Sequence, residues 1–408
     1  MNKIKMSLVA AIAAAAATTG ANAGALDSIL SNPKLDVELR PRYEAVDDSV
    51  HKDASALTVR TAIGVQAGLL GVDGLNAQLQ AMSVDHFGLV NDYNGKTAGD
   101  PAYAVVADPA QTRMTQANIS YSANGFTGIF GRKMVVLDNA RFIGNVGWRQ
   151  MPQTYDLVAG IYNGVENLSL LAAYVSRVNK VVQATADTNT VLLHASYKVM
   201  PELTLTAYDY MVASYADHIG IRATGKVNLD AATLKYQAEY AIQNDATMEE
   251  GNAGKPDQDA SYYKIAVDAT MNGFTVGAGY EVLGEKGSGT NAFYTPLATL
   301  HAMNGWADVF LGGTPDEGLE DMTFKLGYNA GELGKIVGIY HNFSSDKSNA
   351  AGQDDLGSEI DVAYKYKINK GLGLLLKGAW FSEGDVGFSA KDRTKYWVQL
   401  DYKFHAEL

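Results

Sequence analysis

Alternating apolar and polar residues recur along most of the chain, and the clearest stretch is 395–404. One set of alternate side chains in this stretch is aromatic at both ends and aliphatic in the middle: Tyr396, Val398, Leu400, Tyr402 and Phe404. The intervening set is mostly polar: Trp397, Gln399, Asp401 and Lys403. A period of two residues predicts a β-strand, because successive side chains point to opposite faces. Rings at the ends of an apolar face are typical of a strand that crosses a bilayer.

The same alternation predicts further strands in both halves of the chain. The clearest are in segments 34–46, 57–66, 75–84, 234–243, 263–268, 322–329 and 359–368. Segments 203–214 and 334–343 alternate poorly. The pattern predicts an all-β fold, a transmembrane antiparallel β-barrel of about 18 strands that forms one domain over residues 24–408. A barrel of this size has an interior too wide for side chains alone to fill.

Connection lengths also follow a rhythm. Short turns are predicted at 124–125, 163–164, 200–201, 272–273 and 369–371, three of them as Asn-Gly, which supplies the positive φ angles of a tight hairpin. Longer polar connections are predicted at 87–111, 136–151, 179–189, 244–259, 284–317, 345–357 and 384–392. Such a difference predicts short periplasmic turns and long extracellular loops.

The N-terminus predicts export. Lys3 and Lys5 precede a short apolar run and the small-residue triplet Ala21-Asn22-Ala23, so residues 1–23 are predicted to be a cleaved signal peptide. The predicted location is the cell outer membrane of a Gram-negative type of cell. The chain has no Cys, so no disulfide framework is expected. Expected partners are outer-membrane lipid, lipopolysaccharide, the barrel-assembly machinery and small hydrophilic or anionic solutes. No nucleic acid, cofactor or metal is expected.

Arginines are concentrated in the first half of the chain. Arg40, Arg42 and Arg60 occupy lumen positions on two predicted neighbouring strands, which predicts a ladder on one wall. An alternative is that they pair with nearby acids, namely Asp36, Glu38 and Glu44. The irregular 131–150 stretch adds the charged residues Arg132, Asp138, Arg141 and Arg149. If it folds inward, these residues form a charged constriction. The alternative is an outer loop whose arginines pair with acids or lipopolysaccharide phosphates.

A second irregular stretch, 291–311, is unusually apolar for an exposed loop. Its composition predicts packing inside the lumen as a plug or lid. The candidate lumen residues are Leu297, His301, Trp306 and Asp308.

Three stretches together resemble one group of proteins: Arg40 to Glu44, Gly131 to Gln150, and Thr295 to Asp308. They resemble the alginate-export-type outer-membrane barrels, which are close to the Opr-type porins. The resemblance implies an 18-stranded barrel that carries hydrophilic, usually anionic, solutes. Two features depart from it. His405 to Leu408 follow Phe404, where many barrels end on Phe, and acids accompany the lumen arginines.

The favoured interpretation is a passive outer-membrane porin for small hydrophilic, anionic solutes. The alternative within transport is an exporter of an anionic, alginate-like polysaccharide. An enzyme is not favoured, because the seven His residues are scattered without a nucleophile and an orienting group beside them. A structural or adhesive surface protein is a further alternative.

Overall fold

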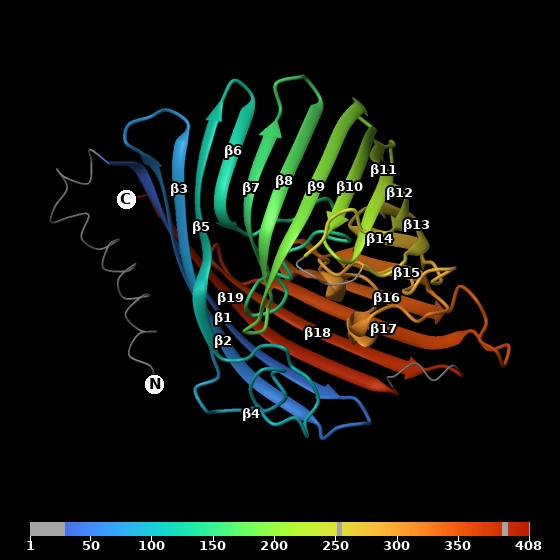
Figure 1. Ribbon diagram of the computed structural model, residues 1–408. Helices are drawn as coiled ribbons and strands as arrows, with labels where there is room; N and C mark the ends of the chain where they lie inside the picture. The colour runs from blue at the N-terminus through green and yellow to red at the C-terminus, as the bar shows by residue number, and fades with distance from the viewer. Residues whose placement is uncertain (1–28, 251–254, 386–390, 408) are drawn as a thin grey trace.

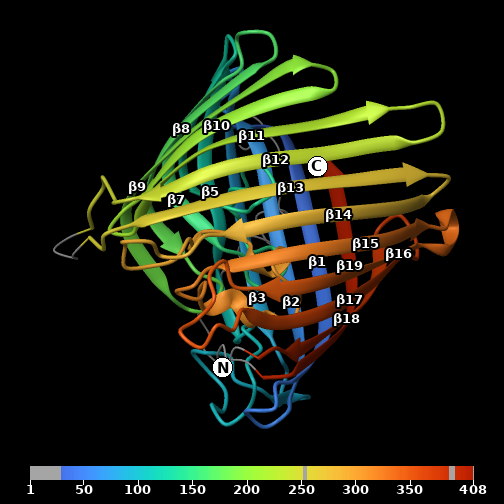
Figure 2. The same ribbon diagram turned by 90° about the vertical axis from the view of Figure 1, so that its right-hand side faces the viewer.

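A computed structural model describes residues 29–250, 255–385 and 391–407. The predicted signal peptide, residues 1–23, lies outside the described residues. The regular secondary structure of the described chain is almost entirely β-strand, wound into a barrel (Figures 1 and 2). The strands are β1 (Leu30–Asp47), β2 (Ala54–Leu69), β3 (Leu75–Asp85), β4 (Asn91–Asp92), β5 (Gln111–Ala123), β6 (Phe126–Lys133), β7 (Thr154–Tyr162), β8 (Leu168–Asn179), β9 (Thr185–Met200), β10 (Leu203–Val212), β11 (Ala216–Asn228), β12 (Thr233–Asn244), β13 (Asp259–Met271), β14 (Phe274–Leu283), β15 (Leu319–Asn329), β16 (Lys335–Ser344), β17 (Asp355–Lys367), β18 (Leu372–Glu383) and β19 (Arg393–Glu407).

The barrel is closed by the pairing of its first and last strands. β1 pairs with β2 on one side and with β19 on the other, and every pairing between strands is antiparallel. The two-residue β4 pairs only with β2, where Ser55 faces Asp92, while β3 pairs directly with β5. Setting β4 aside, the ring contains 18 of the 19 strands. The predicted fold class and strand number are confirmed, and closure leaves no unpaired strand edge.

β19 shows how the alternation is used. Tyr396 and Val398 are 48% and 47% exposed and face outward, whereas Trp397 and Gln399 are 1% and 4% exposed and face the interior. The predicted assignment of its two faces is therefore confirmed. The strand continues past Phe404 to Glu407 and pairs there with the start of β1.

The connections alternate between the two ends of the barrel as predicted. Asn124-Gly125 and Asn272-Gly273 form two-residue hairpins in which all four residues have positive φ. The predicted tight turn at 163–164 is instead a five-residue connection, 163–167, in which Asn167 adopts the left-handed conformation. The prediction of a long connection at 179–189 was also wrong. β8 and β9 extend into it and leave only 180–184.

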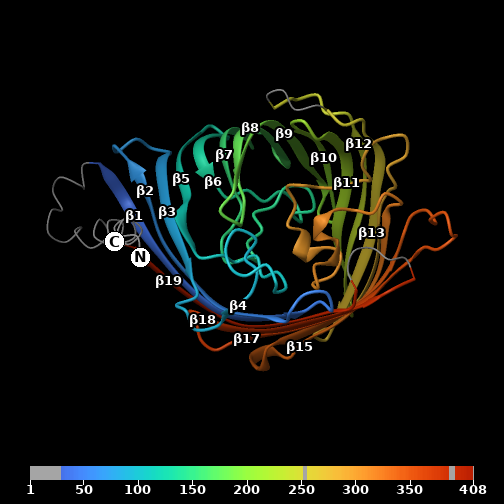
Figure 3. The same cartoon turned by 60° about the horizontal axis from the view of Figure 1, so that its bottom comes forward.

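In the part of the chain that the structure describes, helix is confined to three short 3-10 turns, η2 (Leu300–Ala302), η3 (Val309–Gly312) and η4 (Gly331–Leu333). Among the described residues, no helix is long and apolar enough to cross a membrane. η2 and η3 belong to the connection between β14 and β15, which lies inside the ring of strands (Figure 3).

Candidate functional site in the barrel interior

Two long connections fold into the barrel and bind each other there. We call them the first inner loop (134–153, between β6 and β7) and the second inner loop (284–318, between β14 and β15). The Gly144 amide donates to the Leu297 carbonyl at 2.9 Å, and the Thr299 amide donates to the Ala140 carbonyl at 2.9 Å. A side chain at Gly144 would collide with the Thr299 backbone. The glycine therefore permits the close approach of the two loops.

An aromatic cluster anchors both inner loops to the wall of β10 to β14. Phe142 of the first inner loop lies 4.9 Å from the ring of Tyr208 and meets Tyr262 edge-on at 5.6 Å. Phe293 of the second inner loop stacks on Tyr262 at 5.2 Å. All four rings are buried, so apolar packing holds the loops inside the barrel.

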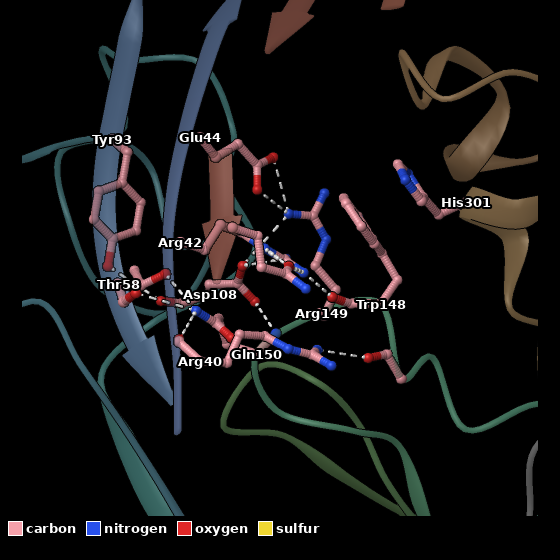
Figure 4. Close-up of polar contacts among 12 residues, drawn as sticks. Arg40, Arg42, Glu44, Thr58, Tyr93, Asp108, Trp148, Arg149, Gln150 and His301 are labelled. Atoms are coloured by element: carbon pink, nitrogen blue, oxygen red, sulfur yellow. Dashed lines mark hydrogen bonds and ion pairs between the residues drawn. The ribbon is translucent and has the colours of Figure 1, made fainter. Parts of the chain in front are cut away.

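On the opposite wall, the first inner loop meets the arginines of β1. Figure 4 shows Arg42 and Arg149 on either side of Asp108, with Trp148 beside them. Arg42 donates to the Gln399 side chain and the Trp148 carbonyl, and its guanidinium lies 4.1 Å from the centre of the Trp148 ring. Arg149 donates to both Glu44 carboxylate oxygens at 3.0 Å.

The predicted arginine wall exists, but acids accompany each of its members. Arg40 pairs with Asp401 at 2.6 Å, and Arg60 pairs with Glu38 at 2.5 Å. Arg42 lies 3.5 Å from Asp108, which belongs to the connection between β3 and β5. The linked set contains five cations, Arg40, Arg42, Arg60, Arg149 and Lys395, and five carboxylates, Glu38, Glu44, Asp108, Asp308 and Asp401. Five minus five leaves no formal net charge on this wall.

The other predicted constriction residues lie elsewhere. Arg141 is fully buried across the barrel, 3.1 Å from Glu281 of β14. Asp138 lies 3.2 Å from both His194 and Arg222. Arg132 is not in the interior: it continues the outward face of β6 and pairs there with Asp156 at 2.6 Å. The prediction that Arg132 lines the pore was wrong, because β6 extends through a residue that had been assigned to a loop.

Of the predicted residues of the second inner loop, Asp308 contacts the arginine wall directly and His301 contacts Asp308. One carboxylate oxygen of Asp308 accepts hydrogen bonds from Lys395 at 2.7 Å and from Arg149 at 3.0 Å. The other oxygen accepts one from His301 Nδ1 at 2.6 Å. The Leu297 carbonyl also accepts a hydrogen bond from the Tyr155 hydroxyl. These contacts tie the second inner loop to β19 and to the first inner loop.

Lys377 of β18 lies at the centre of an aromatic cage. Its ammonium is 3.7 Å from the Trp306 ring centre, 4.2 Å from Trp148 and 5.1 Å from Trp397. The same ammonium lies 2.7 Å from His301 Nε2, and the His301 ring stacks on Trp148 at 4.5 Å. Three of the four tryptophans in the sequence thus surround one cation.

The protonation state of His301 follows from its neighbours. Burial lowers the pKa of His301 well below its ordinary value, against the opposing pull of Asp308. The imidazole is therefore neutral, accepting from Lys377 and donating to Asp308. Burial alone would raise the pKa of Asp308, but the hydrogen bond from His301 and the charges of Lys395 and Arg149 hold it well below its ordinary value.

Sequence reasoning missed a second basic region near the short-turn end. Lys226 faces Lys235 across β11 and β12, and Lys335 faces Lys365 across β16 and β17. Lys325 lies between Phe324 and Leu326, which face outward, so it points inward. We call these five residues the lysine belt. Like charges placed directly opposite each other destabilise a sheet, so the arrangement calls for a functional reason.

The lysine belt borders an open recess of about 440 Å³ lined by Lys235, Lys325, Lys335, Lys365 and Asp268. Asp268 and Lys325 meet at 2.6 Å above Gly277, whose strand separates theirs. A side chain at Gly277 would occupy the space of that ion pair. Five lysines against the Asp268 carboxylate leave an excess of four positive charges. The sequence signal that could have identified this belt is the recurrence of Lys at inward-facing alternate positions of several strands, close to the short turns.

Within the ranges that the structure describes, no group of three or more His, Asp or Glu residues is placed to hold a metal ion.

Searches found no matching protein family and no matching curated protein. Solved structures of outer-membrane proteins do match. Pseudomonas aeruginosa OpdK matches with a TM-score of 0.73 and 15% identity, over 93% of this chain and 100% of that chain. Acinetobacter baumannii OccAB3 matches with a TM-score of 0.74 and 16% identity, over 92% and 99%. P. aeruginosa OccK8 (OprE) matches with a TM-score of 0.68 and 17% identity, over 91% and 98%.

At this level of identity the likeness establishes the fold. The chain has the closed 18-stranded barrel of the Opr- and Occ-type outer-membrane proteins, as the resemblance to Opr-type porins implied. The alginate-export-type label receives no support from these matches.

Proposed function

We propose that the protein is an outer-membrane porin, a passive channel for small hydrophilic solutes with a preference for anions. The carrying observation is the closed barrel with an apolar outward face and charged residues on its inward face. Such a wall suits lipid on one side and water on the other. The inner loops narrow the interior at the level of the arginine wall. The similarity to OpdK, OccAB3 and OccK8 supports the same role.

The proposed preference for anions rests on the lysine belt rather than on the arginines. The arginine wall is balanced by carboxylates, so its field is short-ranged. The belt has an excess of positive charge on an open recess, where a solute passes within reach. A structure of OpdK with vanillate, an organic anion, is among the matches and favours the same class of solute.

The magnitude can be worked from the charges. A lysine charge about 10 Å from a monovalent anion contributes roughly 0.4 kcal/mol in water. Three such charges contribute about 1.2 kcal/mol before screening, and about a third of that with a Debye length of ~8 Å. Loss of three belt lysines should therefore reduce the permeation of a monovalent anion relative to a neutral solute by about two- to eightfold, depending on the salt concentration.

A swelling assay on liposomes tests this proposal with three solutes of matched size: glucose, gluconate and glucosamine. The wild-type protein should make liposomes permeable to all three, with gluconate entering fastest. The variant Lys235→Gln/Lys335→Gln/Lys365→Gln should lose the gluconate advantage and keep glucose entry. The matched control Lys96→Gln/Lys347→Gln/Lys370→Gln removes the same charge from connections outside the wall and should behave as wild type. Swelling no faster than that of empty liposomes would refute the channel.

A further inference from the structure

The outward face of β6 to β9 carries charges near the end opposite the Asn-Gly hairpins. Arg132, Asp156, Arg177 and Asp187 are successive cross-strand neighbours and form one continuous row, which we call the outer arc. Arg132 pairs with both oxygens of Asp156 at 2.6 and 2.8 Å, and Arg177 pairs with Asp187 at 2.5 Å. The signs alternate along the row, so the arc is stable without a partner.

The arc occupies the level at which other strands carry aromatic rings. Phe126 and Phe274 each directly follow an Asn-Gly hairpin. Six residues further along, β14 has Tyr280, which packs against Tyr263, whereas β6 has Arg132. Aromatic rings in barrels mark the boundary between lipid chains and headgroups. The outer arc therefore lies at headgroup level, where a charge on the lipid face costs little.

An apolar recess lies directly beneath the arc. Phe130 faces Val158, and Val158 faces Tyr174, and these three outward side chains are 67%, 52% and 43% exposed. They line an open recess of about 600 Å³ that also includes Gly131, Arg132, Asp156 and Ser176. The small residue Gly131 forms part of its floor, and the charged pair forms its upper edge. The recess thus offers an apolar trough headed by a guanidinium.

We propose that the outer arc and this recess bind a phosphorylated lipid of the outer leaflet. The proposal rests on the outer-membrane location in the proposed function. The lipid phosphates contact Arg177 and Arg132, and an acyl chain lies along Phe130, Val158 and Tyr174. Guanidinium groups bind phosphate in a two-pronged manner.

The exposure of the arginines and the chemistry of the acids support this ligand. Arg177 uses Nε for Asp187, and its side chain is 45% exposed. Asp187 is 64% exposed and can hold the divalent cations that accompany lipid phosphates. A free phosphate ion would use the arginines alone, whereas a phosphorylated lipid would use the arginines and the apolar trough together.

The test is lipid retention by the purified full-length protein, read by native mass spectrometry. The probes are bis-phosphorylated lipid A, the same lipid without phosphates, and inorganic phosphate. Wild type should retain bis-phosphorylated lipid A through delipidation and retain the dephosphorylated lipid at least tenfold less. Millimolar inorganic phosphate should not displace the lipid. The variant Arg132→Gln/Arg177→Gln should lose retention at least tenfold, and the control Lys347→Gln/Lys370→Gln should not.

The single variant Arg177→Gln, at an exposed position, serves as a second test in case the double variant misfolds. It should by itself lower lipid retention several-fold. Equal retention by wild type and both arginine variants would overturn the proposal. Displacement by inorganic phosphate would overturn it in favour of a free-anion site. A change of oligomeric state with unchanged lipid retention would overturn it in favour of an interface between copies of the chain. Conductance of the same variants in planar bilayers should equal that of wild type, so failure of lipid binding is distinguishable from failure of the channel.

Discussion

Neutralising Asp308 should release the second inner loop from the barrel wall. In Asp308→Asn, the buried ammonium of Lys395 and the guanidinium of Arg149 lose the carboxylate that they share at 2.7 and 3.0 Å. Breaking a buried pair by removing one partner costs about 3–5 kcal/mol. At 1.4 kcal/mol per decade, the local opening of the loop should become about 10²- to 4 × 10³-fold more frequent. Hydrogen exchange of residues 300–312, followed by mass spectrometry, measures this opening.

The chain offers a matched control and a rescue for this experiment. Asp316→Asn, in the same loop, removes a carboxylate that is 60% exposed and paired with Lys286, so it should cost less than about 1 kcal/mol. Adding Lys395→Met to Asp308→Asn removes the stranded cation and should restore part of the protection. If Asp308→Asn and Lys395→Met each leave the exchange rate unchanged, or if the cost of the double variant is the sum of their separate costs, the ion pair does not hold the loop.

Three further predictions concern the membrane face, acid and topology. Leu400→Arg, on the outward face of β19, should reduce barrel stability by about 2–4 kcal/mol, whereas Thr224→Arg, on the inward face of β11, should be tolerated. Gel mobility of unheated samples measures folding, and equal effects would contradict the assignment of faces. Burial lowers the pKa of His301 in the packed loop, so the His301 imidazole takes up a proton more readily when the loop is released. The stability that this difference gives the packed loop is therefore fully present above about pH 6.5 and falls at lower pH. Exchange of residues 300–312 should speed up between about pH 6.5 and 5, and His301→Gln should flatten this dependence; a flat wild-type profile would refute it. The chain lacks Cys, so a single Cys at Ser348 should react with an impermeant thiol reagent on whole cells and one at Lys370 should not. Labelling of the Cys at position 370 would show that the barrel has the opposite orientation in the membrane.

Alternation of side chains was sufficient to predict the barrel and the two faces of its most regular strands. It predicted the two faces of β19, because a residue's parity fixes its side of a sheet. Parity does not identify the partner of a side chain. Gln399 illustrates this: parity places it on the inward face of β19, but parity does not show that it accepts two hydrogen bonds from Arg42. An arginine there would face another arginine.

The interior was less predictable because it depends on contacts between distant segments. Asp108, which balances Arg42 and Arg149, comes from a connection with no distinctive pattern. Arg132 was assigned to an irregular loop because Gly131 interrupts the sequence pattern, although β6 continues through it. Lys377 is an ordinary lysine in its strand until the inner loops bring Trp148 and Trp306 beside it, next to Trp397 of β19.

The most direct test of the account is the reversal potential of the purified protein in a planar bilayer across a gradient of potassium chloride. We expect discrete conductance steps and a reversal potential of the sign that denotes preference for chloride. The Lys235→Gln/Lys335→Gln/Lys365→Gln variant should move that potential toward zero, and the Lys96→Gln/Lys347→Gln/Lys370→Gln control should leave it unchanged. Absence of conductance steps would contradict the channel, and a cation preference in the wild type would contradict the role of the lysine belt.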